Sequence, residues 1–283
     1  MKIFAEILLR GMSQVFLLNN VTTGILFFAA IGYSSWFMGI GAIIGVLVGT
    51  FTALLLKYDR KDIQQGLYGY NGILVGLAII CVFGFNLVSV LALVFGAALS
   101  SIIRKGMSAW KVSPYTAPFI ISTWIVMSLL IIFNIIPLQA GDMPEARHVD
   151  IILAVTKGIG QVMFLENFIA GIIVFIGILV SSGITACYAL LGSSIGIAVA
   201  FASSFPLNMI NIGIFGFNAV LCSIAFSNRK WTSLILATAS GIVSVFMMYG
   251  IMKLGIITLT APFVLSTWLV LLISRRVGAK HLL

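Results

Sequence analysis

Long apolar runs, separated by short polar or Gly/Pro-containing breaks, fill most of the chain. The runs lie at 3–32, 35–56, 66–81, 83–103 and 116–137, and then at 157–180, 183–203, 214–227, 232–251 and 255–274. A helix that crosses a bilayer needs about 20 residues. Most runs therefore predict membrane-spanning helices, whereas 66–81 and 214–227 are short. The first run of each set is interrupted by "LLNN" (17–20) or "LENF" (165–168), where we expect the helix to bend.

Composition supports an all-α integral membrane protein. Of the 283 residues, 61% are hydrophobic and only 8% are charged, too few charges to cover a soluble surface. The net charge of +9 could suggest a nucleic-acid partner. Membrane proteins, however, collect Lys and Arg in their cytoplasmic loops. We therefore expect a lipid bilayer around the chain and no nucleic acid.

The Lys and Arg positions predict how the chain is oriented. With five crossings per half and a cytoplasmic N-terminus, all but Arg147, Lys157 and Lys253 fall on the cytoplasmic side. This agrees with the positive-inside rule. Both termini are then cytoplasmic, and the segment 141–156 forms an extracellular or periplasmic linker.

Three motifs occur twice in the same order. "GMSQVFLLNN" (11–20) matches "GIGQVMFLEN" (158–167), "GLYGYN" (66–71) matches "GIFGFN" (213–218), and "TAPFIISTW" (116–124) matches "TAPFVLSTW" (260–268), the last with seven of nine residues identical. Tyr70 follows Gln14 at the same spacing at which Phe217 follows Gln161. The chain is therefore predicted to be an internal duplication.

An odd number of crossings per half would turn the second copy upside down in the bilayer. We expect a first repeat at 1–140, the linker at 141–156, and a second repeat at 157–283 with a short cytoplasmic tail. Inverted repeats are common in transporters, whose substrate path lies between the two halves.

The matched positions carry neutral polar side chains: Gln14 and Gln161, Asn71 and Asn218, and Thr116 and Thr260. Amides and hydroxyls donate and accept hydrogen bonds without charge. Inside a membrane, such groups need partners or line a wet cavity. Pro118 and Pro262 favour the first turn of a helix, so the two threonines should stand at helix starts. The pattern predicts a path for a small, uncharged, polar solute.

Chemistry-bearing residues are otherwise sparse. Glu6 and Glu166 are the carboxylates in or near membrane depth, and Cys81, Cys187 and Cys222 have no CxxC or histidine neighbour. We therefore expect no metal, no cofactor and no enzymatic activity. Glu166 is interpreted as a residue at a helix end, or as part of a vestibule that attracts substrate.

On these motifs, above all "RGMSQVFLLNN", "DRKDIQQGLYGYNGILVGL", "YTAPF", "GIGQVMFLEN", "GFNAVLCSIA" and "LTAPF", the chain resembles the urea transporters over nearly its whole length. The resemblance implies passive, channel-like transport of urea across the cell (inner) membrane by a homotrimer, with one pore in each subunit. It implies two inverted halves, each with five membrane helices and a half-spanning re-entrant helix, here near 66–81 and 214–227.

The resemblance also implies a set of residues along the path. They are Gln14 and Gln161 at the two outer binding regions, Thr116 and Thr260 at the central constriction, and Val15, Leu17, Tyr70, Leu74, Val162, Phe164, Phe217 and Leu221 as the walls. The alternative is an ion-coupled secondary transporter, or a channel for another small neutral solute such as an amide, ammonia or water.

Overall fold

The computed structural model describes residues 2–110, 112–139 and 145–276. All regular secondary structure in these ranges is helical. The expected cytoplasmic tail after residue 276 and part of the expected linker lie outside the described ranges. The chain divides into two compact units, residues 1–142 and 143–283.

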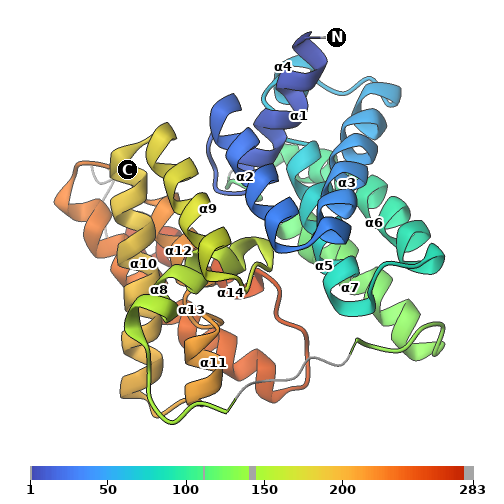
Figure 1. Ribbon diagram of the computed structural model, residues 1–283. Helices are drawn as coiled ribbons and strands as arrows, with labels where there is room; N and C mark the ends of the chain where they lie inside the picture. The colour runs from blue at the N-terminus through green and yellow to red at the C-terminus, as the bar shows by residue number, and fades with distance from the viewer. Residues whose placement is uncertain (1, 111, 140–144, 277–283) are drawn as a thin grey trace. The chain divides into compact units, whose positions relative to one another are not determined.

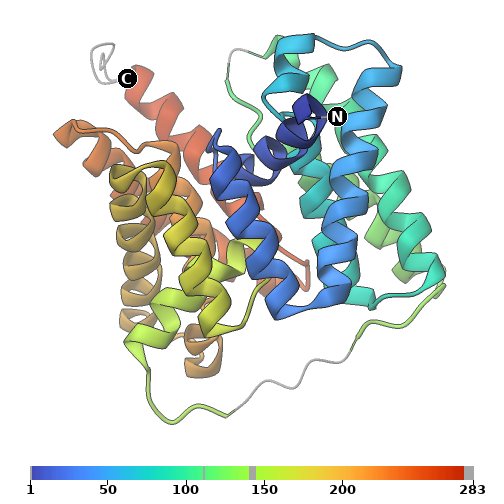
Figure 2. The same cartoon turned by 45° about the horizontal axis from the view of Figure 1, so that its top comes forward.

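Unit 1 contains seven α-helices within the described ranges (Figure 1). They are α1 (Lys2–Gln14), α2 (Val21–Ser34), α3 (Trp36–Leu55), α4 (Arg60–Gln64), α5 (Gly69–Phe83), α6 (Leu87–Gly106) and α7 (Ala117–Ile132), with a 3₁₀ turn, η1 (Met107–Ala109), after α6. Helix α3 follows α2 almost without a break (Figure 2). Ser35 lies between them, and its side chain caps α3.

Unit 2 has the same number of α-helices in the described ranges, with its 3₁₀ turn at a different position. Its helices are α8 (Ile151–Gly160), α9 (Phe168–Ser181), α10 (Gly183–Ala202), α11 (Leu207–Asn211), α12 (Phe217–Ala225), α13 (Trp231–Lys253) and α14 (Ala261–Arg276), with the 3₁₀ turn η2 (Gln161–Met163) after α8. Helix α8 begins within the segment predicted as a linker. The inverted arrangement of the repeats stays a prediction.

Helices α5 and α12 form the centres of their units, and nearly all their residues are buried. Helix α5 packs against α3, α6 and α7, and α12 packs against α10, α13 and α14. Glycines allow the closest approach: a Cβ built at Gly45 on α3 would lie 2.1 Å from the carbonyl oxygen of Gly72 on α5. The corresponding Gly192 on α10 would meet the oxygen of Ala219 on α12 at 2.4 Å.

The predicted interruptions are confirmed in both units. Helix α1 ends at Gln14, and α2 begins at Val21, where Asn20 caps it through the amide of Thr23. In unit 2, the segments 151–163 and 168–181 are bent by 73°. Asn167 caps the second segment by accepting from Ile169 and Ala170. Asn20 and Asn167 therefore each mark the start of a new helix. An asparagine side chain at this position accepts hydrogen bonds from backbone amides that lack an intrahelical partner.

Four helical segments in the described ranges are long and apolar enough to cross a membrane. They are α3, α6 continued into η1, α10 and α13. Helices α2, α5 and α7 are shorter apolar helices, and the bent pair α8–α9 fits either a broken span or a re-entrant loop. A geometry that fits re-entry is thus found at 151–181, whereas the re-entrant helices expected near 66–81 and 214–227 stay a prediction.

Candidate functional site

The turn that ends α1 contains three of the predicted path residues, Gln14, Val15 and Leu17. The amide of Leu17 donates to the carbonyl of Gln14 at 2.9 Å, and the amide of Leu18 donates to that of Ser13 at 3.2 Å. This pair of bonds is a Schellman motif, in which one residue adopts the left-handed conformation. That residue is Leu17, with φ +58°. Val15 is fully buried within the turn.

Unit 2 builds the same turn after α8. Phe164 donates to Gln161 at 3.0 Å, Leu165 donates to Gly160 at 3.2 Å, and Phe164 has φ +60°. Val162 is buried. A left-handed conformation at a residue with a Cβ costs about 1–2 kcal/mol. Both units therefore hold a strained, bulky residue at matching positions, Leu17 in one and Phe164 in the other.

The two glutamines make the same long-range contact. The side-chain amide of Gln14 donates to the carbonyl of Gln65 at 3.1 Å, and that of Gln161 donates to the carbonyl of Ile212 at 3.1 Å. Each pair lies 51 positions apart in the sequence. A primary amide has two N–H donors and one acceptor oxygen. This bond uses one donor and fixes the orientation of the side chain.

The wall residues on the central helices are buried. Tyr70 and Leu74 lie in the first turns of α5, and Phe217 and Leu221 lie in those of α12. The Tyr70 hydroxyl donates to the carbonyl of Tyr115, the residue before Thr116. Tyr70 therefore links α5 to the entry of α7, which Phe217 cannot reproduce because it has no hydroxyl.

Both threonines stand at helix starts, as predicted. Helix α7 begins at Ala117, directly after Thr116, and α14 begins at Ala261, directly after Thr260. The backbone carbonyls of Thr116 and Thr260 accept the first hydrogen bonds of these helices. The donors are the amides of Ile120, at 3.0 Å, and Val264, at 3.2 Å. The threonine side chains are buried.

Asn71 and Asn218 have a structural task that the sequence did not reveal. The side-chain oxygen of Asn71 accepts from the backbone amide of Phe119 at 3.2 Å, and that of Asn218 accepts from the amide of Phe263 at 3.0 Å. Phe119 and Phe263 lie in the first turns of α7 and α14, so each asparagine caps a helix from a neighbouring helix. This cap accounts for the recurrence of both asparagines, and their expected role along the path stays a prediction.

Glu166 is exposed in the turn before α9, next to Asn167. Its expected vestibule role stays a prediction. Across the described ranges, no group of His, Cys, Asp and Glu side chains is arranged to hold a metal ion. The buried Cys222 thiol lies 3.2 Å from the Ser266 hydroxyl.

Each of these contacts joins residues of one unit. In unit 1 they tie Gln14 to the segment before α5, and Tyr70 to the segment before Thr116. The sequence did not indicate the carbonyls of Gln65, Tyr115 and Ile212 as partners of these side chains. Backbone acceptors leave no residue signature, although the matched "YTAPF" and "LTAPF" did mark one of the segments.

Comparisons with known proteins give the family. The urea transporter family model matches residues 5–275. Urea transporter 1 of sheep (Ovis aries) is 29% identical over 302 residues, covering 96% of this chain and 78% of that protein. Urea transporter 1 of goat (Capra hircus) is 28% identical with the same coverage, and that of rat (Rattus norvegicus) is 28% identical over 300 residues, covering 96% and 77%. The family match spans almost the whole chain, including both copies of the glutamine turn and of the Thr-Ala-Pro helix start, and the chain therefore belongs to the urea transporter family.

Proposed function

We propose that this chain is a passive channel for urea in the cell (inner) membrane and that it has no enzymatic activity. Its membership of the urea transporter family supports this function, and so does the name of its mammalian relatives. The observation that carries the proposal is the duplicated contact of Gln14 and Gln161 with backbone carbonyls. It sets an uncharged amide beside a carbonyl oxygen at matching positions of both units.

The chemistry of these groups suits urea. Urea is small and planar, with one carbonyl acceptor and four N–H donors. Amide and carbonyl groups at Gln14 and Gln161 would exchange hydrogen bonds with it, and the hydroxyls of Thr116 and Thr260 would do so at the narrowest point. The proposed walls are Val15, Leu17, Tyr70, Leu74, Val162, Phe164, Phe217 and Leu221. They would exclude hydrated ions, because an apolar slot offers no replacement for an ion's water.

In this proposal, residues 1–140 and 157–283 are inverted repeats joined by the linker 141–156, and the path runs between them. The distribution of Lys and Arg supports cytoplasmic termini. One chain supplies both walls, so each subunit would carry its own pore. The resemblance to the family supports a homotrimer.

Urea flux through purified protein tests the function. In stopped-flow efflux from proteoliposomes, we expect urea permeability well above that of protein-free liposomes. We expect no change with a protonophore or with sodium replaced by choline. Accumulation of urea against its gradient would instead identify an ion-coupled transporter, and flux no greater than in empty liposomes would refute transport of urea.

A further inference from the structure

A group of basic side chains lies on unit 1, where the turn between α3 and α4 meets the end of α6. We call it the α3–α6 basic cluster, and its members are Lys57, Arg60, Lys61, Arg104 and Lys105. The three cations of the turn and Lys105 are exposed, and Arg104 is partly buried. The distribution of Lys and Arg along the chain predicts that this surface faces the cytoplasm.

Two tyrosines bring the two parts of the cluster together. The ring centres of Tyr58 and Tyr68 lie 5.2 Å apart. The guanidinium carbon of Arg104 lies 5.9 Å from the centre of the Tyr68 ring, and the ammonium of Lys105 lies 5.6 Å from that of the Tyr58 ring. A cation at such a distance is attracted to the face of an aromatic ring. The two cations of α6 are therefore held beside the α3–α4 turn.

The nearby carboxylates do not neutralise this charge. Asp59 accepts hydrogen bonds from the backbone amides of Lys61 and Asp62, at 2.9 and 3.2 Å, and thereby caps α4. Among the described residues, no carboxylate forms an ion pair with a member of the cluster. The Nε of Arg104 and the hydroxyl of Tyr68 are buried and also have no hydrogen-bond partner there. The cluster therefore keeps an excess of positive charge.

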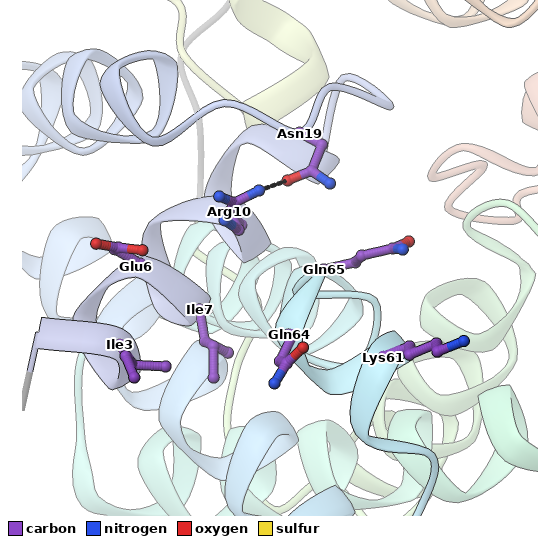
Figure 3. Close-up of a pocket in the computed structure, with 8 residues that line it drawn as sticks. All are labelled: Ile3, Glu6, Ile7, Arg10, Asn19, Lys61, Gln64 and Gln65. Carbon is purple, nitrogen blue, oxygen red and sulfur yellow. Dashed lines mark hydrogen bonds between the residues drawn. The ribbon is translucent and has the colours of Figure 1, made fainter.

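Arg10 of α1 is a neighbouring cation that does have a partner. Its guanidinium donates to the side-chain oxygen of Asn19 at 2.7 Å, across from α4 (Figure 3). In the same view, the Lys61 side chain extends from α4 away from Arg10. Arg10 is therefore not a member of the cluster, whereas Lys61 is available to a partner outside the chain.

Unit 2 keeps the aromatic pair without the basic cluster. Phe205 and Phe215 stand at the repeat positions of the two tyrosines, and their ring centres lie 5.1 Å apart. Residues 204–208 carry no charge, and Tyr249 of α13 stacks on Phe205 at 3.9 Å. A single cation, Lys253, lies 5.2 Å from the Tyr249 ring. The packing of this turn therefore does not require the five cations that unit 1 places there.

Apolar side chains beside the cluster favour a lipid over a soluble anion. Leu55 and Leu56 come directly before Lys57, Ile102 comes shortly before Arg104, and all three apolar side chains are exposed. Helices α3 and α6 pack against each other, and both are in segments long and apolar enough to cross a membrane. Their ends thus combine cations for a phosphate with apolar groups for acyl chains, and an anionic phospholipid carries both.

We propose that the α3–α6 basic cluster binds the headgroup of an anionic phospholipid in the predicted cytoplasmic leaflet. The phosphate would lie between the α3–α4 turn and the end of α6, and the acyl chains would lie along Leu55 and Ile102. Groups of about four or more Lys and Arg at the cytoplasmic ends of membrane helices attract anionic lipids. The bound lipid would join α3 to α6 and stabilise unit 1, whatever solute the chain carries.

Lipid binding to the purified protein in detergent tests this inference. Native mass spectrometry can compare phosphatidylglycerol with phosphatidylcholine of the same acyl chains. We expect phosphatidylglycerol to bind about tenfold more tightly, because each cation near the phosphate contributes. Replacing both Arg104 and Lys105 by Gln should remove most of this preference. Equal affinity of the wild type for the two lipids would overturn the proposal.

Two controls separate this site from a general effect of charge. Arg229 and Lys230 are exposed, are also predicted to be cytoplasmic, and lie outside the cluster. Replacing both by Gln should leave the lipid preference unchanged, and a loss equal to that of the Arg104 and Lys105 variant would refute a defined site. Millimolar glycerol 3-phosphate should not displace the lipid. Complete displacement would instead show a site for soluble phosphate esters and would contradict the role of the acyl chains.

A second variant covers the case in which the Arg104 and Lys105 variant folds poorly. Lys57 and Lys61 are exposed, so replacing both by Gln removes charge without disturbing buried packing. This variant should bind phosphatidylglycerol several-fold more weakly, with unchanged affinity for phosphatidylcholine. Unchanged affinity for both lipids in this folded variant would overturn the proposal.

Discussion

The side-chain oxygen of Asn218 on α12 accepts a hydrogen bond from the backbone amide of Phe263 at 3.0 Å and thereby caps α14 from outside that helix. The Asn218 side-chain nitrogen lies 3.4 Å from the carbonyl of Leu259, just before Thr260. One buried side chain therefore holds both the end of the incoming segment and the beginning of the helix. This relationship fixes where Thr260 stands.

Replacing Asn218 should mainly destabilise the protein. Asn218→Ala removes a cap and leaves the buried amide of Phe263 without its acceptor. We expect the free energy of unfolding to fall by about 2 kcal/mol. The measurement is thermal or denaturant unfolding in detergent. Asn167→Ala, which removes an exposed cap from α9, is the matched control and should cost less. Equal losses would mean that burial of the cap does not matter.

Gln161→Leu should reduce urea flux about fivefold or more. It removes the amide from the proposed path and frees the carbonyl of Ile212, and a hydrogen bond contributes about 1 kcal/mol. Efflux from proteoliposomes containing equal amounts of protein measures the effect, with unfolding recorded in parallel. Gln14→Leu is the repeat-matched variant and should act in the same direction. Normal flux in well-folded Gln161→Leu would make this residue a structural contact only.

Thr116→Val and Thr260→Val should each slow urea by about fivefold. Valine keeps the shape of threonine but has no hydroxyl, so urea should lose one hydrogen bond of about 1 kcal/mol at the proposed constriction. The double variant should be slower still, whereas thiourea, which is less polar, should be affected less. Initial efflux rates of both solutes provide the test. Normal urea efflux rates in both single variants would mean that the constriction does not lie at Thr116 and Thr260.

Gly213→Ala should prevent normal folding of unit 2. Gly213 has φ +81°, and a Cβ there would lie 2.3 Å from the backbone nitrogen of Gly158 on α8. The combined conformational and steric cost should exceed about 3 kcal/mol. Gly250→Ala on α13 is the control, because a Cβ there meets nothing within 4 Å. The yield of folded protein after size-exclusion chromatography distinguishes them, and a normal yield of Gly213→Ala would contradict the close packing of α8 against this turn.

Predictions about local structure succeeded where the signal was local. The interruptions at "LLNN" and "LENF" and the helix starts at Thr116 and Thr260 follow from Asn capping and from Pro in a first turn, which depend on a few adjacent residues. The membrane class follows from composition, because so many apolar residues cannot be buried in a soluble fold of this size. The duplication follows from repeated motifs at constant spacing.

The tertiary structure alone decided which partner each duplicated amide contacts. Gln161 and Asn218 have similar side chains and both recur in the repeat. Gln161 holds the carbonyl of Ile212, 51 positions away, whereas Asn218 caps a helix 45 positions away. The partners are backbone groups, which every residue carries, so no sequence pattern can name them. The sequence by itself determined that both amides recur in the repeat. Only the packing of distant helices distinguished the amide beside the proposed path from the amide that caps a helix.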